Sequence, residues 1–320
     1  MRVLVTGGAG FIGSHLVDRL ILDGGEVTVL DNLETGRIEN LDHALTTGSL
    51  SFVEGSILDQ QIVDELVAEA DFIYHLAAAV GVFNILKRPL ASLLTNIKGT
   101  ENLLDAAEKY SKPILVASSS EVYGKNVSDS LQEDDNRILG SPLTLRWSYS
   151  QAKAIDETLA FAYWEDKKLP TRIVRFFNTV GPRQLGAYGM VVPRFVAAAL
   201  KGEEITIYGT GEQTRCFGHV ADIVEALIRV ASTDKTIGTV VNIGNPEEIS
   251  INDLAKKIIE ITGSTSTVVH LSYEEAYASG FEDMERRVPN INRIRELTGW
   301  KPTRNLETII KDLADHLQKN

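Results

Sequence analysis

The first half of the chain alternates short apolar runs with stretches whose apolar residues recur every three to four positions. The short runs predict strands at residues 3–5, 27–30, 51–53, 72–75, 114–117 and 172–177. The periodic stretches predict helices at residues 14–23, 62–68, 93–107 and 149–164. This alternating order predicts an α/β fold with a doubly wound parallel sheet. The strands are almost entirely apolar, as expected where helices cover both faces of a sheet.

The rhythm of the sequence changes after residue 178. Helices are predicted near residues 193–201, 251–261 and 306–317, and a short strand at 205–208. The sequence has no internal repeat and no low-complexity linker. We therefore expect a smaller C-terminal α/β substrate lobe, packed closely on the first domain. The expected division assigns 1–177, with about 215–243 interleaved, to the first domain, and 178–320 (about 178–214 and 244–320) to the lobe.

Composition and charge limit the cellular compartment and the binding partners that we expect for this protein. The 320 residues include 32 Lys+Arg and 44 Asp+Glu, a net charge of −12, which predicts no binding to nucleic acid or to an anionic membrane. The single cysteine, Cys216, excludes an intrachain disulfide. No signal-peptide core and no membrane-length apolar run is present, so we expect a cytoplasmic protein. No His/Cys spacing typical of a metal site occurs, and none is expected.

A glycine-rich turn at the N-terminus predicts a dinucleotide site. Gly7, Gly10 and Gly13 directly follow the first predicted strand and open the first helix. Glycines let the backbone approach a pyrophosphate closely, and the helix N-terminus supplies free N–H donors. Asp31 ends the second strand, 24 positions after Gly7, where a carboxylate accepts hydrogen bonds from an adenosine ribose. Because a carboxylate repels a 2′-phosphate, we predict NAD as the cofactor.

Tyr149 and Lys153 form a candidate catalytic pair, because residues four apart share a helix face. A phenol is a poor base at neutral pH unless positive charge stabilises its phenolate. Tyr163 and Lys167 have the same spacing, but they lie about four turns further along the helix. We select Tyr149 because it opens its helix, at the carboxyl edge of the sheet where ligands bind.

Together with Ser119, these residues make the chain resemble the extended short-chain dehydrogenase/reductase family. Within it, the sequence is most similar to NAD-dependent nucleotide-sugar epimerases, decarboxylases and dehydratases, and especially to UDP-glucose 4-epimerases. The resemblance covers nearly the whole chain and implies a Rossmann domain for the first part. The residues it implies for NAD binding are Gly7, Gly10, Phe11, Ile12, Gly13, Asp31, Asn32, Ser56, Ile57, Leu76, Ala77, Ala78, Asn96, Tyr149, Lys153 and Phe176.

The same resemblance implies a UDP-sugar substrate. Asn178 matches a contact to the phosphate-sugar portion, and Tyr208 ends the predicted strand 205–208, which resembles the strand that pairs with uracil. Arg215 and Arg287 match arginines that hold the diphosphate. The full implied set is Ser119, Ser120, Tyr149, Asn178, Val191, Tyr208, Arg215 and Arg287. The family also implies a homodimer, with a four-helix interface from residues 93–108 and 149–165.

The pair Ser120-Glu121 bears on the reaction. The 4,6-dehydratases that the chain resembles use an Asp-Glu pair here, and a serine cannot replace the acid, so 4,6-dehydration is disfavoured. Glu121 leaves decarboxylation or another elimination open. The related decarboxylases carry an arginine where this chain has Met190. This weakens the decarboxylase interpretation, although Arg183 or Arg194 is available to reach the same space.

We expect a UDP-hexose or UDP-hexuronate 4-epimerase. Tyr149, assisted by Ser119, would take the C4 hydroxyl proton while NAD⁺ accepts hydride, and the 4-keto sugar would rotate before reduction on its other face. The first alternative is a UDP-glucuronate decarboxylase, supported by Glu121 and by the segment Arg287-Val288-Pro289. The second is a UDP-sugar dehydratase that uses Glu121. The third is a non-catalytic NAD-binding sensor, against which the intact Ser119, Tyr149 and Lys153 argue.

Overall fold

A seven-stranded parallel sheet forms the centre of the computed structural model, which describes residues 1–80, 87–186, 190–272 and 286–319. The strand order is β11-β6-β5-β4-β1-β2-β3. The strands are β1 (Arg2–Thr6), β2 (Glu26–Asp31), β3 (Leu50–Glu54), β4 (Phe72–His75), β5 (Ile114–Ser119), β6 (Thr171–Phe176) and β11 (Val240–Ile243). The predicted doubly wound α/β fold is thus confirmed.

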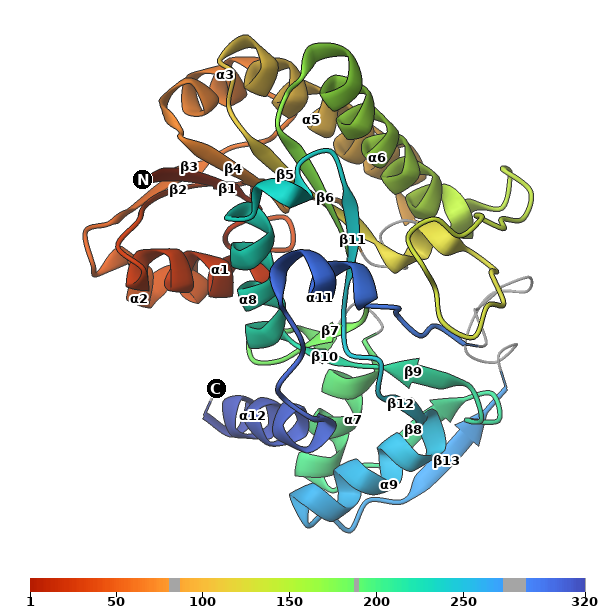
Figure 1. Ribbon diagram of the computed structural model, residues 1–320. Coiled ribbons are helices and arrows are strands. Elements are labelled where there is room, and N and C mark those ends of the chain that lie inside the picture. The colour runs from red at the N-terminus through yellow and green to blue at the C-terminus, as the bar shows by residue number, and fades with distance from the viewer. Residues whose placement is uncertain (81–86, 187–189, 273–285, 320) are drawn as a thin grey trace.

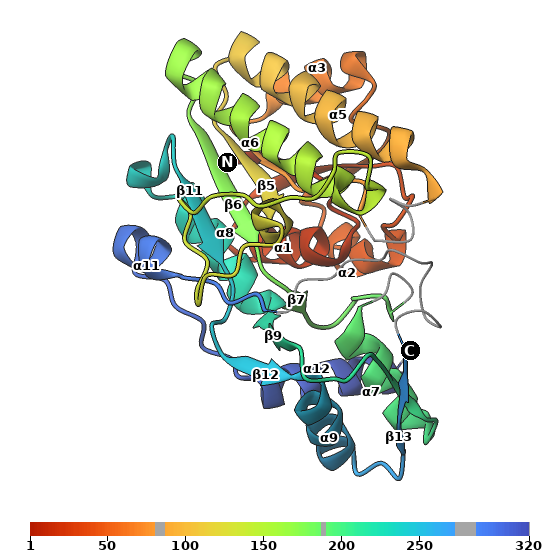
Figure 2. The same ribbon diagram turned by 90° about the vertical axis from the view of Figure 1, so that its right-hand side faces the viewer.

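Helices cover both faces of this sheet, as Figures 1 and 2 show. One layer contains α1 (Phe11–Leu22), the short α2 (Asp42–Leu45) and α8 (Val220–Ala231), and the other contains α3 (Gln60–Glu69), α5 (Pro89–Lys109) and α6 (Ser148–Lys167). Successive side chains of a strand point to opposite faces, so Val3 and Val5 pack under α1 and α8 whereas Leu4 packs under α3 and α5. This alternation produces two apolar cores.

Several elements of the sheet domain were not among the predicted ones, including the short α2 and, more importantly, α8 and β11. β11 pairs in parallel with β6, with Val240 opposite Ile173. Its four residues give a weak strand signal, and its partner lies far away in sequence. The α8 sequence does carry helical periodicity, in Val220, Ile223, Val224 and Leu227, all buried.

A further apolar core, away from the large sheet, lies in the lower part of Figure 2, between α7 (Val191–Lys201), α9 (Ile251–Thr262) and α12 (Leu306–Lys319). Three two-stranded sheets accompany these helices. They pair β8 (Ile205–Tyr208) with β13 (Val268–Leu271), β9 (Thr214–Cys216) with β12 (Glu248–Ser250), and β7 (Thr179–Val180) with β10 (Gly218–His219). The residue division between the two domains stays a prediction.

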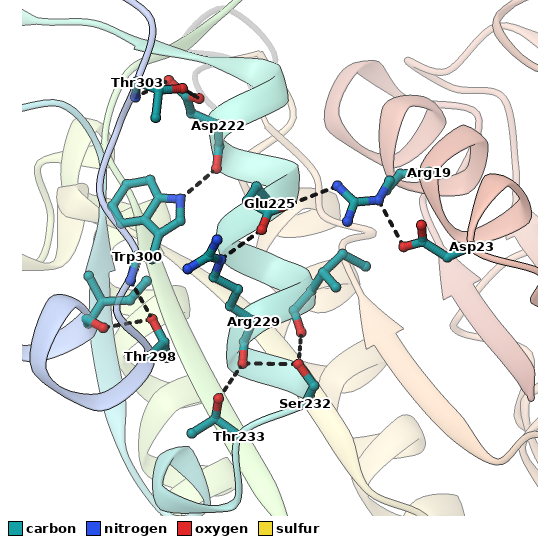
Figure 3. A network of polar contacts seen from close by, with 12 residues as sticks. Arg19, Asp23, Asp222, Glu225, Arg229, Ser232, Thr233, Thr298, Trp300 and Thr303 are labelled. Atoms are coloured by element: carbon teal, nitrogen blue, oxygen red, sulfur yellow. Dashed lines mark hydrogen bonds and ion pairs between the residues drawn. The ribbon is translucent and has the colours of Figure 1, made fainter.

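The chain returns to the first domain before it ends. After α11 (Asn292–Thr298), the buried Trp300 donates its indole N–H to the Asp222 carbonyl oxygen on α8 at 3.0 Å. The Asp222 carboxylate accepts from the Thr303 amide at 3.0 Å and from Arg304 Nη1 at 2.6 Å. Figure 3 shows Asp222 and Trp300 beside the half-buried Glu225, which pairs with Arg19 and Arg229. Within the described residues, no helix has the length and apolar character that crossing a membrane requires.

Candidate active site

The glycine-rich turn connects β1 to α1 and permits no side chain at two positions. Gly7 has φ +72°, and a Cβ there would lie 2.7 Å from the Ala77 amide nitrogen. A Cβ at Gly13 would overlap the carbonyl oxygen of Gly7. The turn therefore brings a backbone without bulky side chains up to the first amides of α1, which fits the pyrophosphate of a dinucleotide.

Asp31 lies at the carboxyl end of β2, beside this turn. Its carboxylate accepts hydrogen bonds from the backbone amides of Ala9 and Leu33, each at 2.9 Å. Burial raises the pKa of Asp31, against the opposing effect of these two hydrogen bonds. Asn32 follows in the same loop, and Ser56 and Ile57 follow the end of the neighbouring β3. These residues share the edge of the sheet where NAD was predicted to bind.

The loop after β4 completes the predicted cofactor region. The Ala77 amide donates to Thr6 Oγ1 at 3.3 Å. Asn96 on α5 accepts from the Ala79 amide at 2.8 Å and donates to the Ala79 carbonyl at 3.3 Å. Asn96 thus fixes the loop that carries Leu76, Ala77 and Ala78. Phe11 and Ile12 lie in the first turn of α1 and Phe176 ends β6; their NAD contacts stay predictions.

Ser119 and Tyr149 are brought together from β5 and α6, and their hydroxyl groups are hydrogen-bonded. Ser119 Oγ also accepts from the Glu121 amide at 3.2 Å. Burial raises the pKa of Tyr149, as do the negative charges of Glu121 and Asp156, while the Ser119 hydrogen bond opposes the rise. Tyr149 is therefore a phenol in the protein alone, and positive charge from a bound ligand is needed to activate it.

Lys153 lies on the same helix and pairs with Asp156, an acid that the motif analysis did not single out. The distance from Lys153 Nζ to Asp156 Oδ2 is 3.0 Å. The second motif-like pair is different, because Tyr163 bonds Asp105 and Lys167 lies 3.8 Å from Glu108. Lys167 and both acids are exposed, and Tyr163 is half-buried. Lys167 thus fits the predicted solvated helix end, whereas the Tyr163 ring packs against the core under α3 and α5.

Glu121 lies in the first turn of the short 3-10 helix η2 (Ser120–Tyr123) and is held by two arginines. Arg146 Nη1 lies 2.7 Å from Oε2 of Glu121, and Arg287 Nη2 lies 2.9 Å from Oε1. Arg287 Nη1 also donates to Ser120 Oγ at 3.3 Å. Burial alone would raise the pKa of Glu121, but the charges of Arg287 and Arg146 outweigh it and lower the pKa to about 2. The three groups together carry a formal charge of +1.

Tertiary structure brings both arginines to this corner. Arg146 lies in η3 (Leu145–Trp147), and its guanidinium stacks 5.3 Å from the buried Trp147 ring. Arg287 arrives through backbone pairing, because Leu131 N donates to Val288 O at 2.8 Å and Leu131 O accepts from Asn290 N at 2.9 Å. Sequence reasoning missed Arg146, whose position three residues before Tyr149 was the available signal. It expected Arg287 at a diphosphate, whereas its contacts are with Glu121 and Ser120.

The other predicted substrate residues lie on the C-terminal lobe or the segments that lead to it. Asn178 donates to the Cys216 carbonyl at 2.9 Å, and Val191 opens α7. Arg215 in β9 donates to the Thr214 carbonyl at 2.7 Å. The Tyr208 ring is covered by the Arg194 guanidinium at 4.2 Å. Whether these residues hold a UDP group stays a prediction.

The two arginines proposed as replacements at Met190 have other partners. Arg183 pairs with Asp18 at 2.7 Å, and Arg194 donates to the Thr206 carbonyl at 3.0 Å besides covering Tyr208. Met190 is exposed where α7 begins. The missing arginine in this loop is thus no argument against decarboxylation, because Arg146 and Arg287 supply positive charge at Glu121. Across the described part of the chain, no three His, Cys, Asp or Glu side chains are grouped to hold a metal ion.

Comparisons with known proteins agree on the family. The family model described as GDP-mannose 4,6 dehydratase matches residues 4–313. A UDP-N-acetyl-α-D-glucosaminuronate decarboxylase of Bacillus cytotoxicus is 42% identical over 97% of this chain and 96% of its own length. UDP-glucuronic acid decarboxylase 1 of Xenopus tropicalis is 39% identical over 99% of this chain and 72% of its own.

Among solved structures, UDP-glucuronic acid 4-epimerase of Bacillus cereus, in complex with UDP-glucuronic acid and NAD, has a TM-score of 0.89. It is 29% identical, over 100% of this chain and 99% of that one. The expectation of a 4-epimerase is wrong, because relatives with markedly higher identity over nearly the whole chain are named decarboxylases. The error came from giving weight to Met190 while Arg146 was overlooked. With its glycine turn, Asp31 and the Ser119–Tyr149–Lys153 group, the chain belongs to the GDP-mannose 4,6-dehydratase family, NAD-dependent enzymes of the extended short-chain dehydrogenase/reductase superfamily.

Proposed function

We propose that the protein is a decarboxylase of a UDP-hexuronic acid. The observation that carries the proposal is the Glu121 corner, where two arginines surround one carboxylate beside Ser119 and Tyr149. A formal charge of +1 suits a second carboxylate, such as C6 of a uronic acid. Within the described residues, the buried Arg287 Nε has no hydrogen-bond acceptor, which leaves a donor for that group.

The chemistry of a uronic acid explains why an oxidoreductase fold suits this reaction. When bound, NAD⁺ supplies a reversible two-electron oxidation at C4 of the sugar. A ketone at C4 makes the C6 carboxylate a β-keto acid. The C5–C6 bond then breaks, its electron pair moves onto the C4 oxygen, and CO₂ leaves. C5 takes up a proton and C4 is reduced, so UDP-hexuronate and one proton give a UDP-pentose and CO₂ without net oxidation.

Different residues of the chain have different roles in this reaction. Tyr149 accepts the C4 hydroxyl proton through its hydrogen-bonded partner Ser119 or directly. Arg287 binds the departing carboxylate, and Arg146 holds Glu121 in place. Glu121 itself is a poor acid and a weak base, because the arginines lower its pKa to about 2. That property disfavours an elimination in which Glu121 would have to exchange a proton at neutral pH.

A panel of UDP-sugars tests the proposal. Purified protein is incubated with NAD⁺ and with UDP-N-acetylglucosaminuronate, UDP-glucuronate or UDP-glucose, and the products are followed by mass and proton NMR. We expect a uronate to give a product lighter by one CO₂. A product of equal mass, or loss of water, contradicts decarboxylation. The UDP-N-acetylhexuronate is tested first, since the 42% identical relative bears that name.

Two neighbouring arginines provide a matched comparison. Arg287→Met removes the buried guanidinium at Glu121, and we expect CO₂ release to fall by at least a hundredfold. Arg286→Met is the control, because Arg286 is exposed and pairs with Glu248 and Asp129 instead. Equal activity of the two variants would exclude Arg287 from carboxylate binding.

We also propose a homodimer through α5 and α6. Exposed apolar side chains line these helices, among them Leu94 at 52% and Phe161 at 48% exposure. Leu94→Glu combined with Phe161→Glu should convert a dimer to monomers in sedimentation. Leu22→Glu, on α1 and 82% exposed, is the control and should leave the sedimentation unchanged.

A further inference from the structure

The buried ion pair between Lys153 and Asp156 is not explained by the reaction steps above. The two residues are 2% and 0% exposed, and the Nζ–Oδ2 distance is 3.0 Å. Removing two charges from water costs more than the pair returns in most proteins, so a buried pair is weak evidence for a stabilising role. Because Asp156 pairs with Lys153 of the candidate catalytic group, a role of this pair in the reaction explains its burial better than a role in stability.

A chain of hydrogen bonds continues from this pair to the cofactor turn. His75 on β4 lies 2.9 Å from Thr6 Oγ1 and 3.0 Å from Thr100 Oγ1. Thr6 directly precedes Gly7, and the Thr100 hydroxyl is hydrogen-bonded to Asp156. Burial raises the pKa of Asp156, while the Lys153 charge and the Thr100 hydroxyl oppose the rise. His75 is uncharged, because burial and the nearby Lys153 lower its pKa to about 3. Asp156 is therefore the group that offsets the Lys153 charge.

We propose that Asp156 is a positioning residue, which holds the Lys153 ammonium in place and offsets its positive charge. Tyr149 and a bound nicotinamide then face an ion pair that is nearly neutral as a whole. The proposal rests on the proposed function and on the predicted place of Lys153 at the nicotinamide ribose. Removal of the Asp156 charge would leave an unbalanced ammonium. That ammonium would favour the Tyr149 phenolate and disfavour a positively charged nicotinamide.

Other charges face the same space and stay unchanged when only Asp156 is altered. Several titratable and charged groups of the described residues lie around Tyr149 and Lys153: Glu121 with its partners Arg146 and Arg287, His75 on β4, and Glu157 on α6 with its partner Arg175 on β6. Asp156→Asn keeps the shape of the side chain and removes one negative charge. Asp166→Asn makes the same chemical change at an exposed position of the same helix and serves as control.

The first measurement is the affinity of the protein for NAD⁺ and for NADH, each by calorimetry on the protein freed of dinucleotide. The nicotinamide of NAD⁺ is positively charged and that of NADH is not. Asp156→Asn should therefore raise the ratio of Kd(NAD⁺) to Kd(NADH) by about tenfold. Asp156→Glu, which retains the charge, should restore most of the wild-type ratio. An equal loss of both affinities would reduce Asp156 to a structural residue and overturn the proposal.

The second measurement is the pH profile of kcat/KM for CO₂ release. With Asp156→Asn, the acidic limb should move about one pH unit lower, because the phenolate is easier to form. Asp166→Asn should leave the limb in place. If Asp156→Asn does not fold, Thr100→Val removes the hydroxyl that favours the Asp156 charge, and a smaller shift in the same direction is expected. An unshifted limb in the folded variant contradicts the proposal.

The two measurements separate this inference from the proposed function. The dinucleotide ratio does not depend on any reaction. If the wild type releases no CO₂ but the ratio moves, the decarboxylase proposal fails and the role of Asp156 stands. If CO₂ is released but the ratio and the pH limb are unchanged, the role of Asp156 fails alone.

Discussion

Replacement of Glu121 by glutamine should destabilise the protein in a way that depends on pH. The carboxylate lies between Arg146 and Arg287, which lower its pKa from 4.5 to about 2 although burial opposes them. A shift of this size corresponds to about 3 kcal/mol of folding free energy at pH 7. Glutamine can still accept a hydrogen bond, so the loss is mainly the loss of charge, and it agrees with the ~3–5 kcal/mol for breaking a buried pair.

The sign of the pH effect follows from the lowered pKa. Well above pH 4.5 the Glu121 carboxylate is ionised in both the folded and the unfolded chain, and the lowered pKa contributes its full stabilisation to the wild type. As the pH falls toward about 2, the folded protein loses this stabilisation, and more than half of it is lost by about pH 3. For a chain of 320 residues, about 3 kcal/mol corresponds to a Tm lower by ~5 °C at pH 7.

The assay is thermal unfolding of the wild type and Glu121→Gln between pH 7 and pH 3, with Glu225→Gln as control. Glu225 also lies between two arginines, Arg19 and Arg229, each at 2.7 Å (Figure 3). Its side chain is 32% exposed, compared with 15% for Glu121, so its loss should cost less than about 1 kcal/mol. Equal decreases in Tm for the two variants would refute the reasoning. So would a Tm difference between the wild type and Glu121→Gln that does not become smaller at low pH.

Three further outcomes are expected. Tyr149→Phe should abolish turnover while calorimetry shows unchanged NAD⁺ binding, and an active variant would remove Tyr149 as the base. Gly13→Ala should lose NAD⁺ binding, because the added methyl overlaps the Gly7 carbonyl, whereas Gly186→Ala, whose methyl would meet its neighbours at 3.6 Å, should bind normally. His75→Gln should flatten the loss of stability between pH 7 and pH 5 by about 2 kcal/mol in denaturant unfolding, because only the unfolded chain protonates His75 there while its folded pKa is about 3.

Local sequence determined much of the first domain. The strand at Phe72–His75 was predicted with its observed bounds, and other predicted strands differ by one or two residues at their ends. These elements are apolar runs between turn residues, a signal that lies within a few positions of the chain. The glycine turn, Asp31, and the pair Tyr149 and Lys153 were likewise visible, because backbone approach and helix spacing are local properties.

Only the tertiary structure decided what Glu121 does. Arg287 is distant in sequence and reaches Glu121 because residues 288–290 pair with Leu131. Arg146 is near Tyr149 in sequence, but no periodicity indicates that its guanidinium turns toward Glu121. The strength of an ion pair depends on the distance between the two charged groups and on their burial, and local sequence predicts neither. The sequence therefore determined the fold and the cofactor chemistry, whereas the ion pairs at Glu121, on which the proposed decarboxylation rests, appeared only when three segments of the chain met.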